Sequence, residues 1–208
     1  MQMVVALGGN AILRRGERGT AEEQRYHVKI AAGHLVRIIQ GGHQIIITHG
    51  NGPQIGDILE KDECASDKFP RMPLDICGAE SLGMIGYLIQ QALENALSEA
   101  GMNNRVITVV SQTLVDQEDP AFRSPEKPIG PFYAGPESAM LESSLGWMMH
   151  EIPGQGFRRV VPSPIPLEIV ETNSIRTLFE EGFIVVASGG GGIPVIRDKE
   201  GRLSGVEA

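Results

Sequence analysis

The feature that most constrains the fold is a set of three glycine-rich turns, each of which directly follows a short apolar run. The turns are Gly8-Gly9-Asn10 after residues 3–7, Gly50-Asn51-Gly52 after residues 44–48, and Gly189-Gly190-Gly191-Gly192 after residues 182–187. Apolar, β-branched runs of this length indicate buried strands. If these strands are parallel, the turns after their carboxyl ends lie at one edge of the sheet. We therefore predict that the three turns share one crevice.

Glycine-rich turns at such a crevice suit the binding of an anion. Glycine lacks a Cβ atom, so backbone N–H groups can approach an oxyanion closely, and a helix N-terminus adds partial positive charge. Any one of these turns, taken alone, is more simply a structural turn. Their convergence after three strands favours an oxyanion or phosphate cradle. The pattern is neither a Walker loop, because no Gly-Lys-Ser/Thr follows, nor a dinucleotide fingerprint, because Gly8-Gly9-Asn10 lacks a third glycine.

The segments between the apolar runs have helical signatures. Thr20-Ala21-Glu22-Glu23 forms a capping box, which predicts a helix start, and Gly41-Gly42 predicts its end. Residues 74–100 indicate one long helix, and residues 105–110 indicate another strand. This alternation predicts an α/β fold, specifically a three-layer αβα sandwich with an open, mostly parallel sheet.

Residues 116–168 interrupt the alternation and are rich in Pro, Gly and Ser. Such an interruption predicts a small protruding subdomain, inserted into an α/β domain formed by residues 1–115 and 169–208. Residues 195–208 indicate a hairpin that leads into another strand. The chain stops there without a closing helix, and we expect the α/β domain to be incomplete at its C-terminus.

Lys127 is the candidate catalytic residue, because prolines stiffen the segment around it and could aim its amine at a transferring phosphoryl group. A solvated surface lysine is the alternative. Arg158 and Arg159 could bind an anion or pair with surface carboxylates. Asp116 and Asp119 could hold a metal, although turn residues are the more common role.

Composition narrows the class of protein further. The net charge of −8 argues against a general nucleic-acid-binding protein, which needs a basic face. We expect no membrane span, since no run approaches the roughly 20 apolar residues required. The N-terminus lacks a signal-peptide pattern, so a cytoplasmic location is expected. Cys64 and Cys77 suggest neither a disulfide framework nor a metal site, and Cys77 is expected to be buried.

Longer sequence runs carry a resemblance to a known family. They are Ala6–Ala11 (ALGGNA), Thr48–Gln54 (THGNGPQ), Ile85–Leu93 (IGYLIQQAL), Lys127–Tyr133 (KPIGPFY), Arg158–Pro164 (RRVVPSP) and Ala187–Val195 (ASGGGGIPV). Their content and order resemble the carbamate kinases, and they cover nearly the whole chain. The wider amino-acid kinase superfamily shares the first glycine turn but lacks the KPIGPFY and four-glycine runs.

The resemblance implies a homodimer that transfers a phosphoryl group reversibly between ATP and carbamate, giving ADP and carbamoyl phosphate, as in arginine metabolism. Mg²⁺ would accompany ATP or ADP and bridge its phosphates. The resemblance also implies roles for the turns. Gly8, Gly9 and Asn10 would cradle the phosphoryl group, Gly50, Asn51 and Gly52 would face carbamate, and Gly189, Gly190 and Gly191 would complete the substrate site. Lys127 would stabilise developing charge.

The chain departs from the family pattern in one respect. Family members continue with an Asp-Lys-Asp segment and a later glycine-rich lysine segment that bind the nucleotide, and neither occurs in residues 1–208. We therefore expect this chain alone to bind ATP poorly and to show little or no kinase activity.

Two alternatives stay open. One is another amino-acid kinase that phosphorylates a carboxylate such as acetylglutamate. Such enzymes usually have a lysine just before the first glycine turn, where this chain has Ala6-Leu7. The other is a non-catalytic fragment that binds carbamoyl phosphate.

Overall fold

A computed structural model describes residues 1–14 and 16–208. In chain order its elements are β1 (Gln2–Leu7), the 3-10 turn η1 (Gly9–Ala11), α1 (Ala21–Gln40), β2 (Gln44–His49), α2 (Gly52–Ala65), α3 (Leu74–Glu99), β3 (Val106–Thr108), β4 (Gln112–Val115), η2 (Pro120–Phe122), β5 (Lys127–Tyr133), α4 (Gly135–Leu145), β6 (Met148–Ile152), β7 (Gly156–Val161), β8 (Pro166–Ile169), α5 (Thr172–Glu180), β9 (Ile184–Val186), η3 (Gly189–Gly191), β10 (Ile193–Arg197) and β11 (Leu203–Gly205).

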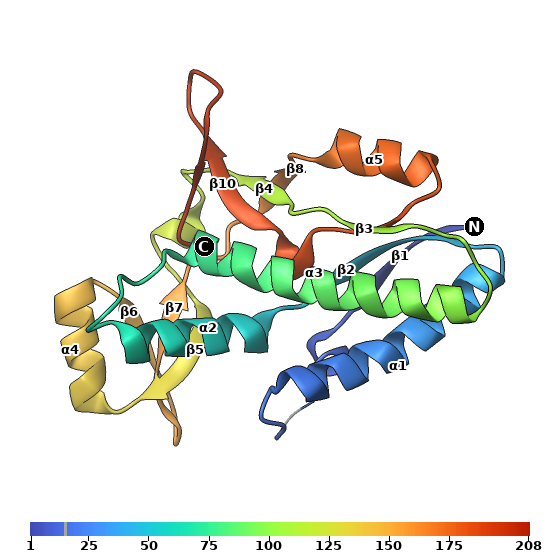
Figure 1. Cartoon of the computed structure of the whole chain (residues 1–208). Helices are drawn as coiled ribbons and strands as arrows, with labels where there is room; N and C mark the ends of the chain where they lie inside the picture. Colours follow the sequence, from blue (N-terminus) through green and yellow to red (C-terminus); the bar gives the residue numbers. More distant parts are fainter. Residues whose placement is uncertain (15) are drawn as a thin grey trace.

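The main sheet has the order β1-β2-β9-β3, and its strands are parallel. Helices cover both of its faces (Figure 1). Side chains such as Ile47 and Val186 pack with α1 and α3, whereas Val185 packs with Ile175 and Phe179 of α5. Successive residues of a strand point to opposite faces, so β9 must be apolar throughout, as observed. The predicted three-layer αβα fold is confirmed.

A second sheet continues the first, because β3 leads into β4 and β9 leads into β10. Its order is β11-β10-β4-β8, and β10 pairs with β4 in parallel, as β9 pairs with β3. The sequence did not reveal the break between the two sheets. The predicted strand at 105–110 ends at Thr108, and Val110 is 52% exposed. Left-handed φ angles at Ser188 and from Gly190 to Gly192 prevent the β9 ladder from continuing without interruption.

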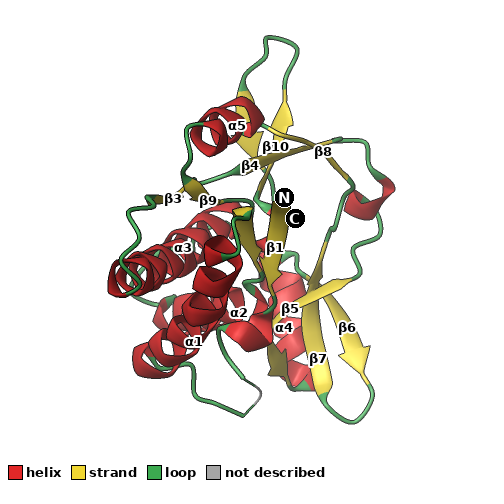
Figure 2. Cartoon of the chain, turned by 90° about the vertical axis from the view of Figure 1, so that its right-hand side faces the viewer, coloured by secondary structure: helices red, strands yellow, loops and turns green. Residues whose placement is uncertain are grey.

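A third sheet, with the antiparallel order β5-β7-β6, lies within the predicted insertion (Figure 2). Tyr133, Leu141 and Met149 form its small core with α4. The three-stranded sheet also contacts α2, because Ile129 on β5 packs with Ile55 and Leu59 of that helix. This packing places the first residue of β5, Lys127, beside the N-terminal half of α2.

The Glu207 side chain links α3 to the three-stranded sheet. One carboxylate oxygen accepts a hydrogen bond from the Leu74 N–H group at the start of α3, at 2.7 Å. The other oxygen accepts from the Arg159 guanidinium on β7. The acidic side chain thus satisfies one of the free N–H groups of a helix N-terminus that has no side-chain cap of its own.

Several local predictions are confirmed. Thr20 and Glu23 form the reciprocal capping box at α1, with the Thr20 N–H donating to Glu23 at 2.8 Å. Helix α3 is continuous through its glycines, and β10 and β11 form the expected hairpin. Cys77 is buried, and Cys64 is exposed. Within residues 1–14 and 16–208, no helix combines the length and apolar character needed to cross a membrane.

Gly86 is required where α3 crosses β3. A Cβ atom on Gly86 would lie 2.2 Å from the Thr108 methyl carbon, and the Thr108 hydroxyl donates to the Gly86 carbonyl at 3.0 Å. We predict that Gly86→Ala lowers the free energy of unfolding by about 1–3 kcal/mol through overpacking. Gly83→Ala, on the same helix but facing open space, should leave it unchanged or raise it by up to about 1 kcal/mol. Urea unfolding measures both, and equal effects would contradict the prediction.

Candidate functional site

The structure brings the three glycine-rich turns together. The Gly50 N–H group donates to the Leu7 carbonyl at 2.9 Å, and a Cβ atom on Gly50 would lie 3.4 Å from the Gly9 nitrogen. On the other side, Cβ atoms on Gly189 and Gly190 would collide with the side chains of His49 and Asn51, at 2.2 Å in each case. The turn after β2 is therefore packed between the other two.

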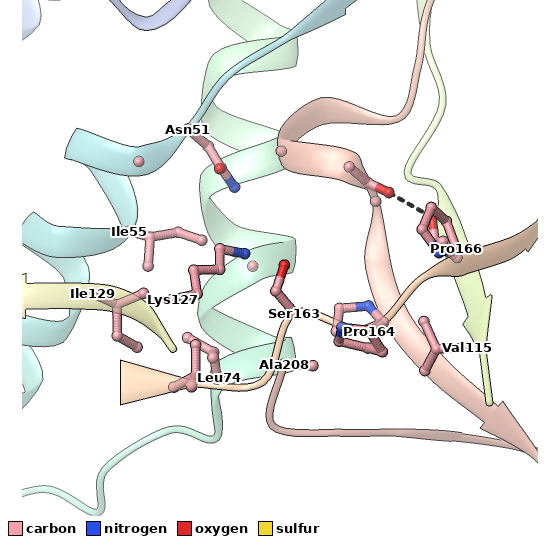
Figure 3. Close-up of a pocket in the computed structure, with 18 of the residues that line it drawn as sticks. Asn51, Ile55, Leu74, Val115, Lys127, Ile129, Ser163, Pro164, Pro166 and Ala208 are labelled. Carbon is pink, nitrogen blue, oxygen red and sulfur yellow. Dashed lines mark hydrogen bonds between the residues drawn. The ribbon is translucent and has the colours of Figure 1, made fainter. Parts of the chain in front are cut away.

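A cavity of about 350 Å³ opens where the turns after β2 and β9 meet the start of β5. Figure 3 shows Asn51, Lys127 and Ser163 directed into this space. The predicted site residues in its lining are Asn51, Gly52, Lys127, Gly189, Gly190 and Gly191. Gly8, Gly9, Asn10 and Gly50 are not part of this lining; Gly9 packs against Gly50, next to the Asn51–Gly52 turn.

Hydroxyl groups from neighbouring strands hold the four-glycine turn. Thr113 on β4 donates to the Gly191 carbonyl at 2.6 Å, and Thr48 on β2 donates to the Ser188 carbonyl at 2.9 Å. The Gly191 and Gly192 N–H groups are bonded inside the turn. In the described residues, the Gly189 and Gly190 N–H groups donate to no protein acceptor. These two N–H groups are therefore candidate donors to a ligand.

Positive charge reaches the cavity from the three-stranded sheet. Lys127 is exposed, and none of the ion pairs among the described residues includes it. Arg158 also lines the cavity, where its Nε atom donates to the Gly130 carbonyl at 3.0 Å and its guanidinium lies over Phe132. Arg159 instead pairs with Glu207. Of the two arginines, only Arg158 faces the candidate anion site.

The His49 ring packs against Gly189 in the four-glycine turn. It is 4% exposed, its Nδ1 atom lies 3.1 Å from the Gly50 carbonyl oxygen, and its buried Nε2 atom has no partner. Burial lowers the pKa of His49, and the hydrogen bond to Gly50 only partly opposes this effect. A neutral ring with the proton on Nδ1 satisfies this geometry, since a proton on Nε2 would be buried against Gly189 without an acceptor.

The depressed pKa of His49 makes stability depend on pH. In the unfolded chain a histidine binds a proton near pH 6.5, whereas the folded protein resists protonation until a lower pH. The contribution of neutral His49 is therefore complete above pH 6.5 and decreases as the pH falls below it.

We predict that the wild-type free energy of unfolding decreases relative to that of His49→Asn between pH 7.5 and 5.5, by up to about 1.4 kcal/mol per pH unit. Asparagine retains a donor near the Nδ1 position and does not titrate. Urea unfolding of both proteins across this range tests the prediction. Parallel curves would contradict it.

The described residues contain no group of three or more His, Cys, Asp or Glu side chains arranged to hold a metal ion. Asp116 accepts from the Glu118 N–H group, and Asp119 accepts from the Ala121 and Ile165 N–H groups. These backbone donors lower the pKa of Asp119. Both aspartates are turn residues in the structure.

Comparison with known proteins places the chain in a family. Residues 1–205 match the amino acid kinase family. Carbamate kinases from Trichomonas vaginalis and Pyrococcus horikoshii are 49% and 48% identical to the whole chain, which covers 67% and 66% of their lengths. The structure of Giardia lamblia carbamate kinase bound to AMP-PNP superposes with a TM-score of 0.93, at 43% identity, over the whole chain and 66% of its own.

The chain therefore belongs to the amino acid kinase family. Within that family it belongs with the carbamate kinases, which confirms the resemblance seen in the sequence. It spans about two thirds of the length of these relatives.

Sequence reasoning missed several polar residues around the cavity. Thr113 and Ser81 occur in ordinary strand and helix patterns, and nothing in the sequence distinguishes them from other hydroxyl residues. Ser163 had a signal, since it lies in the Pro162-Ser163-Pro164 run, but no role followed from it. The structure places Ser163 in the cavity lining.

Proposed function

We propose that the cavity binds carbamate and carbamoyl phosphate, and that the protein represented by this chain transfers a phosphoryl group between ATP and carbamate. The observation that carries this proposal is that Lys127 lines one cavity with Gly189 and Gly190, whose N–H groups donate to no protein acceptor among the described residues. Carbamate is a small anion, so its reaction requires oriented donors more than a large apolar surface.

In the reaction, a carbamate oxygen attacks the terminal phosphorus of ATP and the bond to the ADP oxygen breaks, giving carbamoyl phosphate and ADP. Gly50, Asn51 and Gly52 are proposed to face the carbamate. Gly8, Gly9 and Asn10 are proposed to flank the phosphoryl group from the turn that packs against Gly50. Lys127, as the catalytic residue, would stabilise the negative charge on the transferring oxygens.

The relatives support further parts of the proposal. The Giardia enzyme was solved with AMP-PNP, which favours ATP as the phosphoryl donor here. Mg²⁺ is proposed to accompany the nucleotide, bound mainly through its phosphates. We also propose a cytoplasmic homodimer that acts in arginine metabolism, with residues 116–168 as an inserted subdomain of the α/β domain.

For these 208 residues alone we propose ligand binding without phosphoryl transfer. Because they correspond to about two thirds of the relatives, we propose that they bind carbamoyl phosphate more readily than ADP. Calorimetric titration with each ligand separates the two activities. Ordinary carbamoyl phosphate-dependent synthesis of ATP by the 208-residue chain would contradict this restriction.

Lys127 provides a direct test of the site. We predict that Lys127→Met weakens carbamoyl phosphate binding by about 10-fold or more, the effect of losing one charge-assisted hydrogen bond. Lys199→Met, in the exposed turn between β10 and β11, is the matched control and should bind like the wild type. Calorimetry at constant ionic strength measures both. If the two variants bind equally well, Lys127 has no role in the site.

A further inference from the structure

Asn51 occupies a helix N-cap position but does not cap the helix. Asparagine is among the best N-cap residues because its side chain can accept a bond from the backbone of the first turn. In α2 no such bond is present. Instead, the Asn51 Nδ2 atom donates to the hydroxyl oxygen of Ser81 on α3, at 2.9 Å. The side chain is therefore directed to a partner outside its own helix.

While the Ser81 hydroxyl donates its single proton to the Gly78 carbonyl, it acts as an acceptor toward Asn51. It donates to the Gly78 carbonyl, one turn earlier in α3, at 2.8 Å. Ser81 is fully buried. As long as Ser81 keeps its bond to Gly78, an Asn51 amide turned by 180° would place its oxygen against the hydroxyl oxygen, with no proton between them. The pair of bonds therefore favours Nδ2 as the end of the amide that faces α3.

Gly190 confines the same amide from the other side. A Cβ atom on Gly190 would lie 2.2–2.4 Å from Nδ2, Cγ and Oδ1 of Asn51, so the amide packs flat against the glycine turn. In the described residues, Oδ1 accepts no hydrogen bond from the protein, and it is not among the buried unpartnered atoms. Asn51 and Gly78 both line the cavity, and Figure 3 shows the amide directed into it. The Asn51 amide therefore borders the cavity with an oxygen that has no protein donor among the described residues.

From this arrangement we propose that Ser81 is a positioning residue that presents the Asn51 Oδ1 atom as an acceptor and so selects ligands with an N–H donor. The inference rests on the proposed function. The planar amino group of carbamate or carbamoyl phosphate can donate to Oδ1. The methyl group of acetate or acetyl phosphate cannot, and it would leave the acceptor without a partner. Ser81 thus acts on specificity through Asn51, without touching the ligand.

The test compares carbamoyl phosphate with acetyl phosphate, which has a methyl group in place of the amino group. We expect the wild-type chain to bind carbamoyl phosphate at least about 10-fold more tightly, as measured by calorimetry. In Ser81→Ala this preference should fall by about fivefold, the size of one hydrogen bond, because the amide is free to turn over. Ser143→Ala is the matched control. Its hydroxyl also bonds a carbonyl one turn earlier, at 2.9 Å, but is exposed on α4.

The outcomes separate the inference from the function on which it rests. If the wild type binds neither phosphate, the proposed function fails and the inference fails with it. If the wild type binds both equally, or if Ser81→Ala keeps the full preference, carbamoyl phosphate binding stands and the role of Ser81 is wrong. A loss of affinity for both ligands without a change in their ratio would also overturn that role, because it would indicate structural damage alone.

A second measurement needs no ligand. In the free wild-type chain, one Asn51 side-chain N–H proton should exchange with water more slowly than those of exposed Asn104, as observed by NMR. Ser143→Ala should preserve this slow exchange. Equal exchange at Asn51 and Asn104 in the wild type would show that Ser81 does not hold the amide, even if Ser81→Ala could not be purified.

Discussion

The site depends on how one buried serine bridges the break between two sheets. Ser111 is fully buried where β3 ends and β4 begins. Its hydroxyl donates to the Val109 carbonyl at 2.9 Å and accepts from the Ser188 N–H group at 3.0 Å, while its own carbonyl accepts from the Ile193 N–H group at 2.8 Å. Buried backbone groups need hydrogen-bond partners. These bonds supply them in the gap where the β3–β9 pairing ends and the β4–β10 pairing has not yet begun. The four-glycine turn lies in this gap, between β9 and β10, and is not paired with a neighbouring strand.

Because the four-glycine turn is not paired with a strand, its N–H groups are not all used in sheet hydrogen bonds. Inside a sheet, its N–H groups would be paired with a neighbouring strand. In the turn, carbonyls bond to Thr48 and Thr113, while the Gly189 and Gly190 N–H groups remain available. The neutral ring of His49 fills the space below Gly189 without adding a charge. Electrostatic attraction for an anion therefore comes from backbone dipoles, Lys127 and Arg158, in a protein whose net charge is −8.

The fold was predictable from sequence because its signals are local. The capping box at Thr20, the apolar runs and the glycine turns each specify their own element, and right-handed parallel connections leave few arrangements for them. The polar contacts between elements were not predictable. Ser81 and Asn51 are 30 residues apart, and their bond arises only when α2 and α3 are packed. The sequence placed the Gly8 turn in the same crevice, and the structure packs Gly9 beside Gly50, but which turn residues border the cavity could not be predicted.

Glu207 reinforces the contact between α3 and the three-stranded sheet. Its carboxylate joins the start of α3, where Leu74 packs with Ile129 and Val161, to Arg159 on the same sheet. Arg159 is the register partner of Ile129, two residues from Lys127. The segment after β11 therefore acts as a cross-link, because a single carboxylate holds the first turn of α3 and the sheet that carries the lysine amine.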